Sequence, residues 1–266
     1  MFNKIISNKK ISTDIYILSL EYRRNQKAPQ PGQFFMIAIP DHPELVLRRP
    51  FSVCDYDGKK MDICYKIVGK GTSALSVLKK GTHIDILGPF GNEFKLPENK
   101  KNIILIAGGI GAAPFLFLSK QIRKKYFGNK GTITLLYGGK SSSDLPLKKS
   151  FGKIIDKIIV STEDGSEGYK GFITEILIKE INKLKEEEKT DTIIFASGPQ
   201  AMLKEVDKIV LKNDINCQLT AESVMGCGYG VCLGCILEKK DADKEAKKHT
   251  LVCTDGPVFN SGEIKW

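Results

Sequence analysis

Hydrophobic and polar positions follow one pattern up to about residue 98 and another beyond it. In the first part, short segments either alternate apolar and polar residues or form compact apolar runs of strand length. The strands predicted from these patterns are 14–22, 32–40 and 61–69. Many short strands separated by glycine and proline turns predict a small antiparallel β-barrel over residues 1–98.

From residue 99 the pattern changes to strands that alternate with helices. The predicted strands are 103–109, 131–139, 157–162 and 192–198, and the predicted helical stretches are 113–127, 173–188 and 199–213. This alternation is typical of a parallel sheet with crossover helices, which we assign to residues 99–213. The tail, residues 214–266, is rich in cysteine and glycine and holds a charged stretch at 238–249. We expect a mixed β and α/β protein with a third, small C-terminal domain.

Composition and charge narrow the class of protein. The formal net charge is +10, but the lysines are scattered, so a solvated surface is favoured over nucleic-acid binding. The apolar segment 103–118 is interrupted by glycines and Pro114 and is shorter than the ~18 to 20 residues that cross a bilayer. Residues 1–10 lack the pattern of a signal peptide. We therefore expect a cytoplasmic protein that binds neither a membrane nor nucleic acid.

Four of the 7 cysteines give the strongest chemical signal. Cys227, Cys232, Cys235 and Cys253 follow the spacing C-x4-C-x2-C…C of a plant-type [2Fe-2S] centre. Zinc is the competing metal, but zinc ribbons usually carry two C-x2-C pairs. We predict an iron–sulfur cluster, with the intervening glycines letting the loop curl and bring N–H groups close to the sulfurs.

Two segments of the barrel carry residues suited to an anionic, ring-containing ligand. On the predicted strand at 49–52, alternation would point Arg49 and Phe51 to one face, toward a phosphate and a ring. The segment 69–78 leads from a glycine-rich turn into a helix with Thr72 near its start. Such a helix start is either an anion site or a simple cap.

Glycine-rich turns also end two strands of the parallel-sheet region. The segment 106–114 departs from the G-x-G-x-x-G pattern, and Ser197-Gly198-Pro199 closes a later strand. Both turns would lie at the carboxyl edge of a parallel sheet, where such folds bind their ligands.

Together these motifs resemble the ferredoxin-NADP reductase superfamily, in which a flavin-binding antiparallel barrel precedes a Rossmann-like nicotinamide-binding domain. The resemblance rests on RPFS, GKGTS, GGIGAAP, YGGKSSSDL and SGPQAML in this order, and it covers essentially the whole chain. The tail ESVMGCGYGVCLGC…CTDGPVF is similar to that of one branch, the electron-transfer subunits of NAD-dependent dihydroorotate dehydrogenases.

The resemblance implies FAD and a [2Fe-2S] cluster as cofactors and NAD(H) as substrate. It implies that Arg49 binds the FAD pyrophosphate, that Phe51 lies against the isoalloxazine and that Ser52 sits near its reactive nitrogen. The implied FAD-binding residues are Arg49, Pro50, Phe51, Ser52, Cys64, Tyr65, Lys66, Gly71 and Thr72. The implied NAD(H)-binding residues are Gly108, Gly109, Gly111, Pro114, Ser197, Gly198 and Pro199. The four tail cysteines hold the cluster, and no catalytic acid or base is expected for hydride transfer itself.

The resemblance also implies a function and a partner. Electrons would pass from the FMN of a dihydroorotate dehydrogenase catalytic subunit through the cluster and FAD to NAD+, in pyrimidine biosynthesis. The two subunits would form a heterotetramer with two copies of each. Ser197 stands where many relatives carry cysteine, so we expect an effect on the hydride-transfer rate rather than on binding.

Two other functions stay open at this point. Small subunits of NADH-dependent ferredoxin:NADP oxidoreductases or sulfide dehydrogenases share the architecture, but an aspartate tends to replace their first cluster cysteine, so Cys227 favours the first function. A redox-sensing protein without turnover is the second alternative, and the intact flavin and nicotinamide motifs argue against it.

Overall fold

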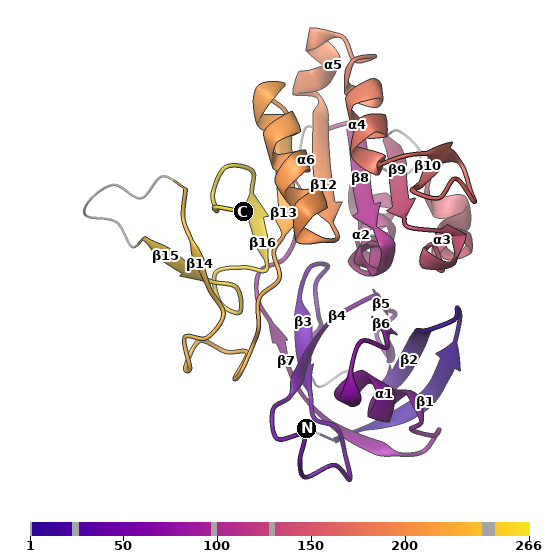
Figure 1. Ribbon diagram of the computed structural model, residues 1–266, viewed down its shortest axis with the longest axis vertical. Coiled ribbons are helices and arrows are strands. Elements are labelled where there is room, and N and C mark those ends of the chain that lie inside the picture. The colour runs from indigo at the N-terminus through magenta and orange to yellow at the C-terminus, as the bar shows by residue number, and fades with distance from the viewer. Residues whose placement is uncertain (1, 23–26, 97–99, 128–130, 241–247) are drawn as a thin grey trace.

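Two seven-stranded sheets and a tail that touches both make up the protein (Figure 1). The structure is a computed structural model that describes residues 2–22, 27–96, 100–127, 131–240 and 248–266. The first sheet lies at the bottom of Figure 1, the second at the top, and the yellow tail lies to one side. The expected mixed β and α/β fold is confirmed.

The first sheet is antiparallel and curls into a barrel. Its strand order is β4-β3-β7-β1-β2-β6-β5. The elements are β1 (Phe2–Lys10), β2 (Ile15–Glu21), β3 (Phe34–Ile37), β4 (Arg49–Ser52), β5 (Asp55–Tyr56), β6 (Lys60–Lys66), α1 (Lys70–Ser76) and β7 (His83–Phe90). The edge strand β4 returns to β6, where the rings of Phe51 and Tyr65 meet edge to face with centroids 5.9 Å apart. Residues such as Leu18, Leu20 and Ile63 alternate into the barrel core.

The second sheet is parallel except for one edge strand. Its order is β11-β10-β9-β8-β12-β13-β16. The strands are β8 (Asn102–Gly108), β9 (Thr132–Gly139), β10 (Lys157–Thr162), β11 (Tyr169–Lys170), β12 (Thr192–Ser197), β13 (Asn216–Thr220) and β16 (Val258–Asn260). The helices are η1 (Gly109–Ala112), α2 (Ala113–Ile122), η2 (Arg123–Phe127), η3 (Ser142–Asp144), α3 (Lys148–Phe151), η4 (Gly152–Ile154), α4 (Ile173–Ile181), α5 (Glu186–Thr190) and α6 (Gln200–Lys212). Helix α2 covers the face toward the barrel, and α4 and α6 cover the other face.

The helical stretch predicted at 173–188 is two helices. Helix α4 ends at Ile181, and α5 begins anew where the Lys185 N–H donates to the Glu188 carboxylate, 2.8 Å away. This side-chain cap starts a separate short helix, so a continuous helix was the wrong prediction. The apolar segment 103–118 is divided among β8, η1 and α2. Among the described residues, none of the helices has the length and apolar character that a membrane crossing requires.

The tail contributes two strands to the second sheet. Strand β13 pairs with β12 in parallel, and β16 pairs antiparallel with β13, with Leu219 opposite Phe259. The remainder forms the hairpin β14 (Ile236–Glu238) and β15 (His249–Leu251), whose connecting residues 241–247 lie outside the described part of the chain. The predicted division after residue 213 cuts β13 from its sheet, so we propose that the C-terminal domain begins after Thr220.

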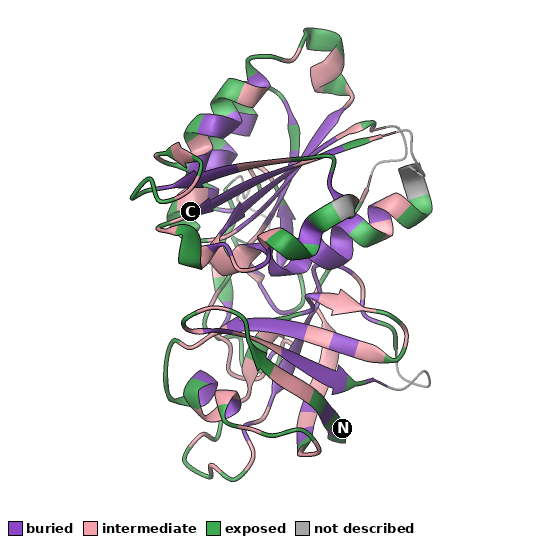
Figure 2. Ribbon diagram, turned by 90° about the vertical axis from the view of Figure 1, so that its right-hand side faces the viewer, coloured by how far each residue is buried: buried purple, intermediate pink, exposed green. Residues whose placement is uncertain are grey.

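Aromatic packing joins the barrel to the second sheet. Phe94, just after the barrel, meets Phe195 of β12 edge to face at 5.3 Å and Phe115 of α2 at 5.8 Å. Figure 2 shows the central strands of the second sheet as buried, with exposure along the helices' outer sides, while the barrel strands mix buried and partly exposed residues. These aromatic contacts contribute most of the stability of the junction. The partly exposed ion pairs that also cross it contribute about 1 kcal/mol or less each.

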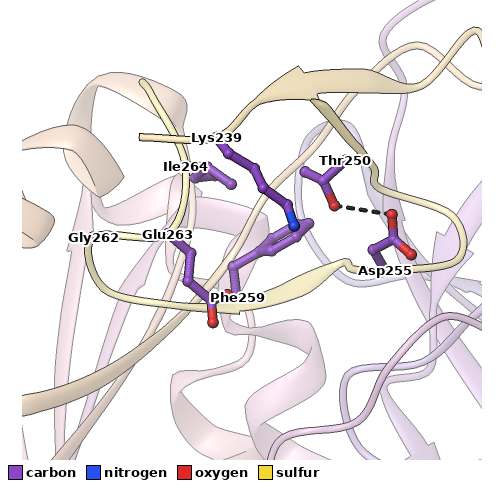
Figure 3. A pocket seen from close by; sticks show the side chains of 7 residues that line it. All are labelled: Lys239, Thr250, Asp255, Phe259, Gly262, Glu263 and Ile264. Atoms are coloured by element: carbon purple, nitrogen blue, oxygen red, sulfur yellow. Dashed lines mark hydrogen bonds between the residues drawn. The ribbon is translucent and has the colours of Figure 1, made fainter. Parts of the chain in front are cut away.

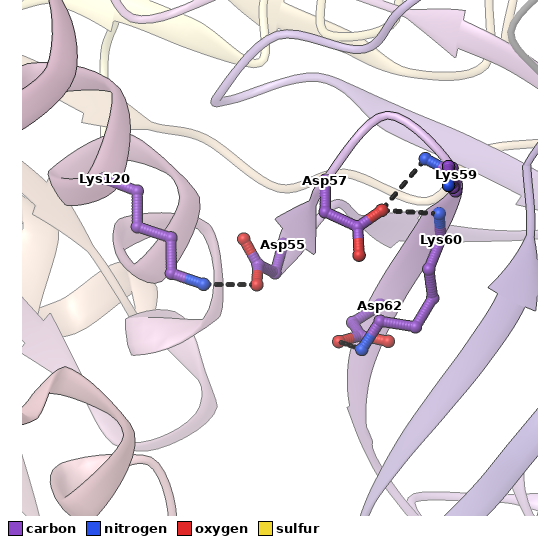
Figure 4. Close-up of polar contacts among 6 residues, drawn as sticks. All are labelled: Asp55, Asp57, Lys59, Lys60, Asp62 and Lys120. Carbon is purple, nitrogen blue, oxygen red and sulfur yellow. Dashed lines mark hydrogen bonds and ion pairs between the residues drawn. The ribbon is translucent and has the colours of Figure 1, made fainter.

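Ion pairs also cross this junction. Lys120 of α2 reaches Asp55 of β5 at 2.5 Å, beside the turn in which Asp57 accepts hydrogen bonds from the backbone of Lys59 and Lys60 (Figure 4). The Lys120–Asp55 pair is partly exposed, so it adds about 1 kcal/mol or less to the stability of the junction.

Truncation of Phe195 tests this aromatic junction. The variant Phe195→Ala should lower the free energy of unfolding by about 3 to 5 kcal/mol, because it removes a fully buried ring and leaves a cavity. Urea denaturation followed by circular dichroism measures the loss. The matched control is Phe172→Ala, whose ring is 60% exposed and whose removal should change little.

Candidate flavin, nicotinamide and iron–sulfur site

The barrel brings its two predicted ligand segments together. Arg49 and Phe51 lie on the same face of β4, as predicted from alternation, while Pro50 and Ser52 are exposed. The guanidinium of Arg49 lies over Gly71, and a Cβ at Gly71 would stand only 2.8 Å from Arg49 Nε. The positively charged guanidinium of Arg49 and the backbone of Gly71 thus lie side by side on the barrel, next to the Phe51 ring. This arrangement fits a pyrophosphate with an adjoining ring system.

The hydroxyl of Thr72 is used locally. It accepts the N–H of Val68 at 2.9 Å and that of Gly69 at 3.2 Å, so it caps the start of α1. Of the two alternatives for this helix start, the Thr72 side chain therefore serves as a cap. Only the backbone of Thr72 is then free to bind a ligand.

The segment 64–66 has three side chains in three surroundings. Cys64 is buried among apolar residues, and this burial raises the pKa of its thiol to about 12. The Tyr65 hydroxyl donates to Asn8 Oδ1 at 3.0 Å. Lys66 forms ion pairs with Asp144 at 2.9 Å and with Asp14 at 3.4 Å, and so joins the barrel to the second sheet.

The two glycine turns of the second sheet meet at its carboxyl edge. They end the neighbouring parallel strands β8 and β12, from which the chain continues to opposite sides of the sheet. A Cβ at Gly111 would overlap the Ser197 carbonyl oxygen, and one at Gly108 would stand 2.6 Å from Pro199 Cδ. Pro114 lies buried in the first turn of α2. A backbone crevice at such a switch point is where open α/β sheets bind dinucleotides.

Ser197 is held by a residue that sequence reasoning missed. Its hydroxyl lies 2.9 Å from that of Thr220 on β13, and only 5% of Ser197 is exposed. The two strands pair with Ala196 opposite Leu219, so Ser197 and Thr220 are adjacent on the barrel-facing surface. Recognising this pair required knowing that β13 joins the sheet.

The four tail cysteines form two pairs. The Cys232 N–H donates to Cys227 Sγ at 3.4 Å, and the Cys253 N–H donates to Cys235 Sγ at 3.4 Å. Further N–H groups of Cys227, Tyr229 and Gly234 point at the sulfurs of the first pair. Across the described residues, no three potential ligand side chains surround a single point as they would around one metal ion. Two cysteine pairs with convergent N–H donors fit a cluster with thiolate ligands.

Burial differs between the two pairs. Cys235 and Cys253 are each 2% exposed, whereas Cys232 is exposed and Cys227 is half-buried. Burial would raise the pKa of the Cys227 thiol, but the N–H groups of Cys232 and Tyr229 outweigh it and lower that pKa to about 6. Burial, together with the neighbouring Cys235, raises the pKa of Cys253 to about 12. The loop therefore has an outer pair and an inner pair.

The inner pair packs on the barrel. Cys235 and Cys253 share an apolar cluster with Phe34 and Met36 of β3. Gly228 has φ +85 and approaches so closely that a Cβ would overlap Met36. Met36 is opposite Pro50 in the pairing of β3 with β4. The strand that contacts the inner cysteines, β3, thus pairs directly with β4, the strand that carries predicted FAD residues.

Asp255 fixes the turn that carries Cys253. Its carboxylate accepts the Leu251 N–H at 2.8 Å and the Thr250 hydroxyl at 3.0 Å (Figure 3). Behind this turn is a cavity of ≈ 350 Å³, which none of the predicted site residues lines. Its lining residues are Lys239, Thr250, Asp255, Phe259, Gly262, Glu263 and Ile264.

The fold and this site define an oxidoreductase that combines flavin, nicotinamide and iron–sulfur binding. Family models match in the same order: an oxidoreductase FAD-binding domain at residues 3–95, an oxidoreductase NAD-binding domain at 105–208 and the iron-sulfur cluster binding domain of dihydroorotate dehydrogenase B at 222–265. The chain belongs to the family of the electron transfer subunits of dihydroorotate dehydrogenase B (NAD(+)).

Curated relatives carry this similarity over nearly their whole length. The subunit from Caldanaerobacter subterraneus subsp. tengcongensis is 34% identical over 261 residues, which cover 98% of this chain and 96% of the relative. The subunit from Listeria monocytogenes is 35% identical and is covered to 97%. Among solved structures, one of NADH-dependent reduced ferredoxin-NADP oxidoreductase aligns with a TM-score of 0.84 and 27% identity, covering 99% of this chain and 90% of that one. Phthalate dioxygenase reductase shares the fold with a TM-score of 0.66 at 18% identity, covering 98% of this chain and 95% of that one.

An alanine at Gly111 tests the crevice at the switch point. The added methyl group collides with the Ser197 carbonyl, and overpacking of this kind costs about 1 to 3 kcal/mol. We expect Gly111→Ala to weaken NADH binding by about tenfold or more, as measured by titration, while bound FAD stays. Gly69→Ala is the control, because nothing lies within 4 Å of its added Cβ. Unchanged NADH affinity in Gly111→Ala would refute the assignment of this crevice.

Proposed function

We propose that this chain accepts electrons from the FMN of a dihydroorotate dehydrogenase catalytic subunit and passes them through its cluster and FAD to NAD+, within pyrimidine biosynthesis. The observation that carries the proposal is the position of β3. Its Met36 packs against the cysteine loop, and its pairing partner β4 holds Arg49 and Phe51. These contacts support a cluster that packs on β3 and a flavin that binds at the neighbouring strand β4.

The different exposure of the two cysteine pairs indicates the direction in which electrons would cross the cluster. The outer pair, Cys227 and Cys232, lies toward solvent, where a partner would deliver electrons. The inner pair, Cys235 and Cys253, lies in the apolar contact with β3, toward the flavin. Backbone N–H groups aimed at the sulfurs stabilise the negative charge that an arriving electron adds.

The remaining residues bind and align the two-electron partners. We assign FAD to Arg49, Pro50, Phe51 and Ser52, to the backbone of residues 64–66 and to Gly71 and Thr72. We assign NAD(H) to the crevice formed by residues 108–114 and 197–199. Bound FAD supplies the conversion between single electrons and a hydride. Ser197 offers a hydroxyl already shared with Thr220, so it orients rather than reacts.

An apolar surface around the outer cysteines is the proposed contact with the catalytic subunit. The exposed fractions of its side chains are Val224 86%, Tyr229 50%, Val231 72%, Leu233 61% and Ile236 47%. All five lie within residues 224–236, around Cys227 and Cys232, and large exposed apolar patches mark interaction sites on soluble proteins. The proposed assembly is a heterotetramer with two copies of each subunit. We place it in the cytoplasm, where the 7 unpaired cysteines stay reduced.

Reconstitution with a catalytic subunit tests the function. The chain, purified with FAD and the cluster and mixed with an FMN-containing dihydroorotate dehydrogenase, should reduce NAD+ when dihydroorotate is added. The variant Cys253→Ser should lose this activity and the visible absorption of the cluster, yet NADH should still bleach its flavin. Cys217→Ser is the matched control, because that thiol lies in the sheet core away from the loop. If activity instead needs ferredoxin and NADP+, the proposal is wrong and the chain has the ferredoxin:NADP oxidoreductase function.

A charge within the apolar surface tests the contact. Leu233→Glu should raise the dissociation constant of the two-subunit complex at least about tenfold, because an unpaired carboxylate would be buried on binding. Analytical ultracentrifugation measures the complex, and NADH-driven flavin bleaching should not change. Ile178→Glu, on the exposed side of α4 and 43% exposed, is the control that should leave the complex intact. Equal affinity of both variants for the catalytic subunit would show that the contact lies elsewhere on the chain.

A further inference from the structure

An aromatic ring of the cysteine loop packs on the barrel. Tyr229 lies between the two outer cysteines in the sequence, and its ring meets that of Phe90 on β7 with centroids 6.0 Å apart and planes tilted by 38°. On its other side, the ring of Phe90 lies 6.0 Å from that of Phe34 on β3. Tyr229 thus joins the outer part of the loop to the barrel, whose strand β3 already contacts the inner cysteines.

Phe90 is the fixed member of this contact. It is opposite Phe34 in the pairing of β3 with β7, and Phe34 is only 3% exposed. The carbonyl of the next residue, Gly91, accepts a hydrogen bond from the Gln33 side-chain amide at 2.8 Å. Strand pairing and this hydrogen bond hold Phe90 in place, so Tyr229 packs on a surface that the barrel builds by itself.

The backbone around Tyr229 needs such an anchor. Gly228 and Gly230 flank it with φ +85 and φ +89, and glycine lacks the Cβ that restricts the backbone of other residues. The N–H of Tyr229 is nevertheless aimed at Cys227 Sγ, 3.5 Å away. Because two unrestricted residues adjoin it, the direction of this N–H depends on the contact that holds the Tyr229 ring.

We infer that the contact of Tyr229 with Phe90 positions the Tyr229 N–H and thereby raises the reduction potential of the cluster. An N–H aimed at a ligand sulfur stabilises the negative charge that one added electron brings, so its effect is larger on the reduced cluster than on the oxidised one. Tyr229 is therefore a positioning residue, whose ring orients its own backbone. The inference rests on the proposed cluster ligands, Cys227 among them, and requires no catalytic subunit.

Redox titration of the isolated chain, loaded with FAD and cluster, tests the inference. Tyr229→Ala should shift the equilibrium between oxidised and reduced cluster about three- to tenfold toward the oxidised form, because the N–H is no longer held on Cys227 Sγ. A tenfold shift corresponds to a potential lower by about 59 mV for one electron. Tyr229→Phe keeps the ring and should stay within about twofold of the wild-type equilibrium. The control is Phe172→Ala, which removes a ring that is 60% exposed at the start of α4 and should leave the potential unchanged.

The same contact is tested from the barrel side. Phe90→Leu keeps an apolar side chain on β7 but removes the ring, and it should lower the potential as Tyr229→Ala does. The double variant should show the shift of a single variant, because both substitutions remove one contact. The EPR spectrum of the reduced cluster should change in both single variants. Hydrogen exchange of the peptide 227–232, measured by mass spectrometry, should be faster in Phe90→Leu.

The inference is overturned by an unchanged potential in Tyr229→Ala, by an equal drop in Tyr229→Phe, or by shifts that add in the double variant. Loss of the cluster from both Tyr229→Ala and Phe90→Leu would also overturn it, since the contact would then be needed for assembly of the site. A wild-type chain that holds no cluster would instead refute the proposed ligands. Failure of the wild-type chain to reduce NAD+ with dihydroorotate and the catalytic subunit would refute the proposed function alone.

Discussion

The packing of the cysteine loop on β3 is the contact on which the rest of the arrangement depends. The tail beyond Thr220 is too short to build an apolar core of its own. It buries Cys235, Cys253, Val252 and Phe259 against barrel residues such as Met36 instead. Because the inner cysteines are buried there, the position of the cluster relative to β4, to which we assign FAD, follows from the folding of the tail. Electron transfer distance and stability of the tail are thus set by the same contact.

The second sheet connects the cysteine loop to the two glycine turns that we assign to NAD(H). Strand β13 leads directly from the sheet into the cysteine loop, and β16 brings the chain back to the sheet after Cys253. Both ends of the loop are therefore anchored in the sheet whose carboxyl edge carries Ser197. The aromatic contact of Phe94 with Phe195 holds the barrel against this sheet. The barrel, the second sheet and the cysteine loop thus each contact the other two.

Local sequence patterns predicted the barrel, the parallel sheet and its glycine turns, and all three are confirmed. These features depend on periodicity and turn chemistry, which a single segment displays by itself. The break between α4 and α5 was missed because helical periodicity continues across it, while the cap formed by Lys185 and Glu188 decides where the second helix begins. The division after residue 213 failed to include β13 because a five-residue edge strand carries little signal of its own.

The sequence by itself determined the chemistry of this protein: cysteine spacing specified the kind of cluster, and the order of the motifs specified three binding regions. Only the tertiary structure decided which cysteines face the barrel, that Lys66 pairs with Asp144, and that Thr220 lies beside Ser197. The physical reason is that ligand type depends on residue identity and local spacing. Burial, strand neighbours and the two sides of a sheet depend on contacts between segments far apart in the chain.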